Sequence, residues 1–230
     1  MSMSWKLMIS LAALLFFAYA KAAIAAHAAH FGDDFRPMDV LSCTVKAMDA
    51  MQEQNFIEGT KDGGVAWGFN EQSVVFVRCV PVNQGVDIEV LAVSQSSGEA
   101  ERLRNQIRIR VFDERRPNLS VLHVDHFNND SGAFGPITRV RNAPPMHWGF
   151  DHRPKSLEAC VSSAKLAMQK KGLPITTGGD SVVWGQSSDV TVLVKCLPIP
   201  GGVDILVAAA SDVGATAEKF RNEIRIITFD

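Results

Sequence analysis

Apolar and polar positions along the chain follow one order of patterns twice. Apolar residues spaced by three and four run from Met38 to about Gln54 and predict a helix. Three short runs rich in β-branched residues follow and favour strands. A second helical stripe, with Ala100, Leu103 and Ile107 on one side, closes the pattern, and the same order returns in the last part of the chain. This alternation of helices and short strands indicates an α+β fold.

The second pattern copies the first in sequence as well as in order. Residues 30–113 align with residues 147–230 without a gap, and about 34 of 84 aligned positions are identical, which indicates an internal duplication. Both copies open with His-x-Gly-x-Asp-x-Arg-Pro and close with Phe-Asp. We therefore expect two tandem α-β-β-β-α repeats, each with a short antiparallel meander, two helices and one disulfide, joined by a linker at 114–146.

Within each repeat the turn chemistry sets the expected element boundaries. The strand-like runs of the first copy are residues 65–68, 73–80 and 86–93. A proline and glycine turn between the second and third runs favours a hairpin. Residues 30–37 and the glycine-rich stretch 59–64 are expected to be irregular. Residues 107–112 alternate and also fit a short strand, but a helix from residue 98 to about residue 110 is favoured.

The N-terminus has the layout of a signal peptide within residues 1–28. Lys6 precedes an apolar run of about 13 residues, from Leu7 to Tyr19, which is too short for a membrane span and typical of a signal sequence. Two Ala-x-Ala sites follow, so cleavage is expected after Ala22 or after Ala28. We therefore expect a periplasmic or secreted protein with no stable membrane span after cleavage.

Four cysteines, two in each repeat at matched spacing, indicate a disulfide framework in an exported chain. Four cysteines allow three connectivities. A unit that once stood alone would close its own bridge, so the repeat pairs Cys43 with Cys79 and Cys160 with Cys196. The sequence has no Cys-x-x-Cys, which argues against a zinc ribbon or a thioredoxin-type site.

Composition and motifs exclude several function classes. The 23 Lys and Arg against 25 Asp and Glu give a formal net charge of −2 and form no basic run, so no nucleic-acid partner is expected. Because no phosphate-binding loop, nucleophile elbow or zincin motif is present, no cofactor and no catalytic residue is predicted. The resulting interpretation is an exported non-catalytic binding or structural module of unknown ligand, built as an internal pseudo-dimer.

The closing helices carry the strongest candidate binding face. Its charged residues repeat at helical spacing and are Glu101, Arg104 and Arg108 in the first copy and Glu218, Arg221 and Arg225 in the second. Arginine holds carboxylate or phosphate with two hydrogen bonds, which favours an unknown protein or small anionic ligand as the partner. The alternative interpretation is a solvated stripe of ion pairs.

The linker offers a competing function. His123, Asp125, His126 and Asp130 lie close together there, and imidazole with carboxylate can bind a divalent metal. An envelope metal-binding protein or enzyme that uses this cluster is therefore the alternative function. The spacing matches no metal signature, and a solvated linker is the simpler interpretation.

Two smaller candidates repeat in both copies. His30 with Asp34 has a counterpart in His147 with Asp151, next to which lies His152, and capping or a local salt bridge is expected rather than a metal site. The Trp-Gly pairs at Trp67 and Trp184 are expected to pack in the core, with a binding surface as the alternative.

One resemblance follows from the motif order. A cysteine in the first helix, then Trp-Gly, then Arg-Cys or Lys-Cys in a strand, then Glu-x-x-Arg in the closing helix resembles small exported bacterial proteins of uncharacterised function. In those proteins the unit usually occurs once. The resemblance implies export and a covalently stapled unit, and it implies no activity.

Overall fold

The computed structural model describes residues 27–61, 64–112 and 144–229, which form two antiparallel sheets and four helices. The first half, residues 27–112, contains β1 (Ala28–Arg36), α2 (Val40–Glu53), β2 (Ile57–Lys61), β3 (Val65–Phe69), β4 (Ser73–Val82), β5 (Gly85–Ser94) and α3 (Ser97–Phe112). The second half, residues 144–229, contains β6 (Met146–Arg153), α4 (Leu157–Lys170), β7 (Ile175–Thr177), β8 (Val182–Gln186), β9 (Val190–Ile199), β10 (Gly202–Ser211) and α5 (Gly214–Phe229). The sheets have the strand orders β1-β5-β4-β3-β2 and β6-β10-β9-β8-β7.

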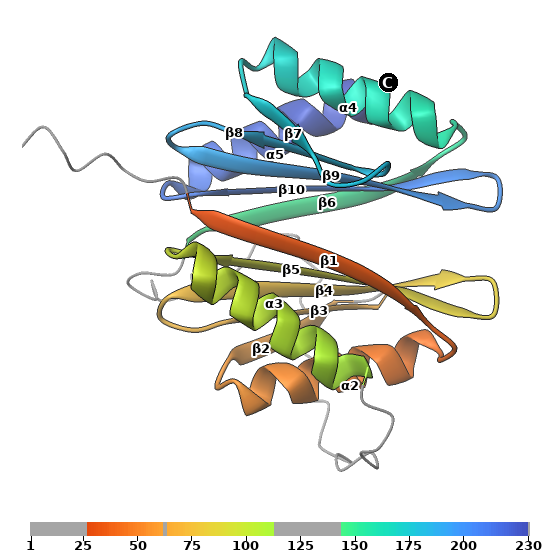
Figure 1. Cartoon of the computed structure of the whole chain (residues 1–230), viewed down its shortest axis with the longest axis vertical. Helices are drawn as coiled ribbons and strands as arrows, with labels where there is room; N and C mark the ends of the chain where they lie inside the picture. Colours follow the sequence, from red (N-terminus) through yellow and green to blue (C-terminus); the bar gives the residue numbers. More distant parts are fainter. Residues whose placement is uncertain (1–26, 62–63, 113–143, 230) are drawn as a thin grey trace, which may run out of the picture.

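The two sheets face each other, and the helices lie on their outer sides. In Figure 1 α2 lies beneath the lower sheet and α4 lies above the upper one. Residues of α3 and α5 pack in the same cores as α2 and α4, respectively. A shared apolar cluster fills the space between the sheets and draws on both halves, with Phe76 and Leu91 from one and Leu193 and Leu206 from the other. The ring centroids of Phe76 and Trp148 are 5.0 Å apart across it. The halves are therefore docked sheet against sheet.

Strand alternation explains why these sheets are apolar on both faces. In β4, Val75, Val77 and Cys79 belong to the core under the helices of the first half. Phe76, between them in the sequence, belongs to the core between the sheets. Because both faces are covered, the strand sequences read as nearly continuous apolar runs, and the exceptions to that pattern mark positions with a polar role.

Both predicted disulfides are present. Cys43 in α2 is bonded to Cys79 in β4, and Cys160 in α4 is bonded to Cys196 in β9. The Cα atoms of the two pairs are 6.1 and 6.2 Å apart. Each bridge therefore fixes the first helix of its half onto a central strand of its sheet.

The strand count differs from the three-strand prediction, because each sheet has five strands. The stretch 30–37 was expected to be irregular, but residues 28–36 form β1, which pairs antiparallel with β5 along its whole length. The stretch 59–64 was also expected to be irregular, but residues 57–61 form β2, which pairs with β3. Gly32, Asp33 and Asp34 in β1 and Gly59 in β2 have low intrinsic strand propensity. Pairing with a neighbouring strand overrides that low propensity.

The closing segments are helical, which resolves the ambiguity at residues 107–112 in favour of helix. Leu103 and Ile107 of α3 are buried in the core of the first half, and Ile224 of α5 is buried in the second. The first helices begin at polar caps, since Asp39 accepts a hydrogen bond from the backbone N–H of Ser42. Among the described helices, none is long and apolar enough to cross a membrane.

Candidate functional site

The arginines of the closing helices lie over the edge strands β1 and β6, on the helix-covered side of each sheet. A β-carbon at Gly32 of β1 would be 3.0 Å from Cδ of Arg104, so glycine makes room for that side chain. The neighbouring residues of β1 on the other face, Ala29 and Phe31, pack between the sheets. The arginine faces are therefore on the outer sides of the sheets, away from the contact between the two halves.

In the first half, carboxylates accompany these arginines. Nη2 of Arg108 lies 3.3 Å from Oδ2 of Asp34, and Nη2 of Arg104 lies 3.9 Å from Oε1 of Glu101. The guanidinium of Arg108 also lies 5.4 Å from the ring centroid of Phe112. This face is balanced internally, as expected for a stripe of ion pairs.

In the second half, the matching arginines lack such partners. A β-carbon at Gly149 of β6 would lie 3.5 Å from Nη1 of Arg221 and 3.7 Å from Cδ of Arg225. Within residues 27–61, 64–112 and 144–229 neither arginine has an ion pair. Nε of each is buried without a hydrogen-bond partner, as is Nε of Arg104 and of Arg108, so the halves differ in their ion pairs alone. The nearby acid Asp151 pairs instead with Arg153, at 2.9 Å.

The second-half arginines are also held in place by an aromatic ring. The guanidinium carbons of Arg225 and Arg153 lie 5.0 and 5.2 Å from the ring centroid of Phe229.

Burial lowers the pKa of Arg221, the charge of Arg225 lowers it further, and Glu218 acts in the opposite direction. Two like charges brought together in a partly buried place are relieved by an anion between them. We call Arg221 and Arg225 of α5, together with the neighbouring Arg153 of β6, the α5 arginine face.

A second group of charged side chains lies between the sheets and was not predicted as a site. This inter-sheet charge cluster consists of Asp33, Arg78, Asp87 and Glu89 from the first half and Lys195 and Asp204 from the second. Arg78 pairs with Asp204 of the opposite sheet, and Lys195 pairs with Asp33. The cluster thus joins the two halves through two ion pairs, and each half supplies the basic residue of one pair and the acidic residue of the other.

Burial has a strong effect on two carboxyls of the cluster. Glu89 is 1% exposed, its Oε2 lies 3.5 Å from Nη1 of Arg78, and its Oε1 has no hydrogen-bond partner in the described part of the chain. Desolvation raises the pKa of Glu89 to about 7, with Arg78 opposing the shift. Desolvation likewise raises the pKa of Asp87 to about 6, with Lys195 opposing it. Both groups titrate near neutral pH.

The sequence held a signal for this cluster. Arg78 and Lys195 occupy matching positions in otherwise apolar strands, and so do Asp87 and Asp204. Each basic residue directly precedes a cysteine that faces the helices, so it must face the other side of its sheet. That side becomes an interior surface only once the two sheets are known to face each other, a fact that the pattern of one repeat does not contain.

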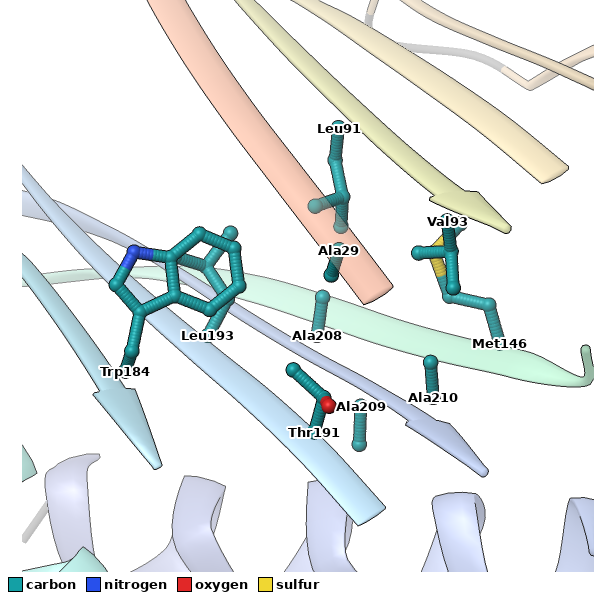
Figure 2. A pocket seen from close by; sticks show the side chains of 10 residues that line it. All are labelled: Ala29, Leu91, Val93, Met146, Trp184, Thr191, Leu193, Ala208, Ala209 and Ala210. Atoms are coloured by element: carbon teal, nitrogen blue, oxygen red, sulfur yellow. The ribbon is translucent and has the colours of Figure 1, made fainter. Parts of the chain in front are cut away.

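A small apolar hollow with a cavity volume of about 10 Å³ also lies between the sheets, beside Trp184 (Figure 2). Figure 2 shows Ala208 and Ala210 of β10 facing Leu91 and Val93 of β5 across it. Ligand pockets usually enclose 300–1,000 Å³. The hollow is a packing gap that follows from the small side chains of β10, and it is too small for an ordinary ligand.

The remaining candidates divide into those the structure places and those it does not describe. His30 forms a hydrogen bond with Ser97 at 2.9 Å, and Asp34 pairs with Arg36 and Arg108, so these two act as local polar contacts. Trp67 and Trp184 pack against the core between the sheets, as expected. The linker cluster lies outside the described residues, and those residues contain no group of three metal-binding side chains.

Comparisons with known proteins assign no family. No protein-family model matches the chain, and no curated protein matches it. Among solved structures, it is similar to the di-domain ARO/CYC protein StfQ of the steffimycin biosynthetic pathway, with 8% identity, a TM-score of 0.25 and coverage of 87% of this chain and 97% of that one. For the di-domain ARO/CYC protein BexL of the BE-7585A pathway the identity is 8%, the TM-score 0.25 and the coverage 86% and 93%. These scores are too low to relate the folds.

Proposed function

We propose that this protein is an exported, non-catalytic binding module, built from two docked copies of one unit, and that its α5 arginine face holds an anionic group of a small ligand or partner protein. One observation supports the proposal. The arginines of the first half are matched by Asp34 and Glu101, whereas Arg221 and Arg225 have no carboxylate within ion-pair distance among the described residues.

The chemistry of these side chains favours carboxylate or phosphate. A guanidinium offers a planar fork of donors that matches two oxygens of such a group. The stacking of Arg153 and Arg225 on Phe229 fixes the donors before the ligand arrives.

Export supports the choice of a binding module over a cytosolic function. Two disulfides indicate an oxidising compartment, because thiols are kept reduced in the cytosol. The signal-like N-terminus leads to the same expectation.

The experiment compares matched pairs of arginines in one protein. Binding of inorganic phosphate and of citrate is measured by NMR chemical-shift titration in low salt, for the double variants Arg221→Gln/Arg225→Gln and Arg104→Gln/Arg108→Gln. We expect the first pair to weaken binding at least about tenfold, which corresponds to one charge-assisted hydrogen bond or more. The second pair is the control and should leave binding unchanged.

Two results would contradict this function. Equal loss in both double variants would show that the anion responds only to overall charge. No shift of α5 or β6 resonances with either anion would show that the face is a structural stripe.

A further inference from the structure

The inter-sheet charge cluster contains more negative than positive groups. Its four carboxyl groups face only two basic side chains, Arg78 and Lys195. Arg78, Lys195, Glu89 and Asp204 are all at least nine-tenths buried, so water screens their charges weakly. Fully ionised, the cluster would carry uncompensated negative charge between two sheets that must stay in contact.

The strand register places Glu89 at the centre of this imbalance. On β5 it lies directly opposite Arg78 of β4 and directly opposite Asp33 of β1. Asp87 is two residues away on the same face of β5, and Asp204 approaches from β10 of the other sheet. Lys195 of β9 is shared with Asp33 and Ser181, the latter at 3.0 Å.

Two further groups complete the surroundings. Asp34, on the opposite face of β1, acts on Asp87 through its charge. His152 of β6 pairs in register with Asp204, but it is exposed. No other element in the described part of the chain brings a charge of either sign to Glu89.

We propose that this cluster is a proton-operated latch, that is, a contact between the two halves whose strength depends on pH. The carboxyl groups of Glu89 and Asp87 take up protons as the medium becomes acidic. The two halves then bind each other more tightly. The proton adds to a carboxylate oxygen and comes from solvent. It removes one negative charge from the interface and leaves the ion pair between Arg78 and Asp204 in place. In an exported protein, whose surroundings are not buffered by the cytosol, docking of the halves thereby responds to external pH.

The direction of the response follows from linkage. The pKa of Glu89 is about 7 in the folded protein and 4.5 for the free side chain, and for Asp87 the values are about 6 and 3.8. Between these limits the folded state binds protons that the unfolded state has released, so stability is greatest at the acidic end and falls as pH rises through about 7. Each group changes the unfolding equilibrium constant by up to about tenfold per pH unit within its window.

The test is urea unfolding of the full, oxidised chain from pH 4.5 to 8, with tryptophan emission and far-UV circular dichroism as probes. The wild type should lose stability as pH rises. Glu89→Gln, which imitates the protonated side chain, should flatten the profile and exceed the wild type at pH 8. Asp87→Asn is an independent second variant with the same expected direction, and Glu223→Gln, on the outer surface of α5, is the control that keeps the wild-type profile.

A third variant shows whether the response joins the two halves. Asp204→Asn removes the second-half carboxylate near Glu89 and frees Arg78 for it, so the decline should move to lower pH. An unchanged profile in Asp204→Asn would place the titration within the first half and overturn the latch. A flat wild-type profile, or a Glu89→Gln profile parallel to the wild type, would overturn it as well.

Discussion

Arg78 of β4 and Asp204 of β10 form an ion pair that joins the two sheets, and each residue is only 6% exposed. The guanidinium of Arg78 also lies 4.0 Å from the ring centroid of Phe150, which belongs to the second half. A buried charge that loses its partner costs far more than an exposed one, because no water replaces the missing contact. Arg78 is therefore the side chain through which the stability of the docked sheets can best be tested.

Replacing Arg78 with methionine should destabilise the protein by about 3–5 kcal/mol at pH 7.5, because buried carboxylates remain without their cation. Urea unfolding measures the change. Arg102→Met is the matched control, since Arg102 is 46% exposed and its pair with Glu99 should contribute less than about 1 kcal/mol. Equal losses in the two variants would show that the inter-sheet pair has no special weight.

Removing either disulfide should weaken its own half. Each bridge closes a loop of 36 residues, for which the chain-entropy account gives about 3–4 kcal/mol. Cys43→Ser/Cys79→Ser and Cys160→Ser/Cys196→Ser should lower the free energy of unfolding by similar amounts. Peptide mapping without reductant should find no free thiol in the exported wild type, and a peptide that joins Cys43 to Cys160 would contradict the pairing.

Signal cleavage is expected after Ala22 rather than after Ala28. The backbone oxygen of His27 accepts a hydrogen bond from Oγ1 of Thr191 at 3.0 Å, and its Nε2 lies 2.6 Å from Oδ1 of Asp212. Cleavage after Ala28 would remove both contacts with the second half. Intact mass of the exported protein separates the two sites, and a mature chain that begins at Ala29 would contradict this expectation.

Docking of the halves should survive cleavage of the linker. Because the sheets share one apolar cluster and two ion pairs, a protease site placed at Asn129 should yield fragments that co-elute at micromolar concentration. Size-exclusion chromatography of the cut, oxidised protein measures this. Fragments that elute separately and keep their circular dichroism would show two independent units.

Local patterns in the sequence were sufficient for the helices and the hairpin strands. The duplication was sufficient for the disulfides, because each repeat carries two cysteines that can close a bridge within it, as Cys43 and Cys79 do. The edge strands were missed because the residues that compose β1, such as Gly32 and Asp33, have low strand propensity and are held by pairing with β5. Propensity describes a residue alone, whereas an edge strand depends on its neighbour.

The candidate sites were predictable to different degrees. The arginine stripe of α5 was visible from spacing, but the lack of an ion pair at Arg221, where Arg104 has one with Glu101, depends on distances in the fold that differ between the two halves. The inter-sheet charge cluster was missed because Arg78 and Glu89 become interior residues only after a second sheet covers them. Packing between distant segments decides burial, and burial decides the chemistry of these side chains.

The facing positions of the two sheets have diverged in charge, and that depends on both sheets belonging to one chain. In an assembly of two identical chains, a mutation at an interface position appears on both sides at once, so a new glutamate would meet its own copy or be duplicated elsewhere in the contact. Here Glu89 of the first half aligns with Leu206 of the second, and Asp33 aligns with Phe150. A single polypeptide can vary one side of its contact at a time, so Glu89 stands beside Arg78 without a second glutamate at the matching position of the other sheet.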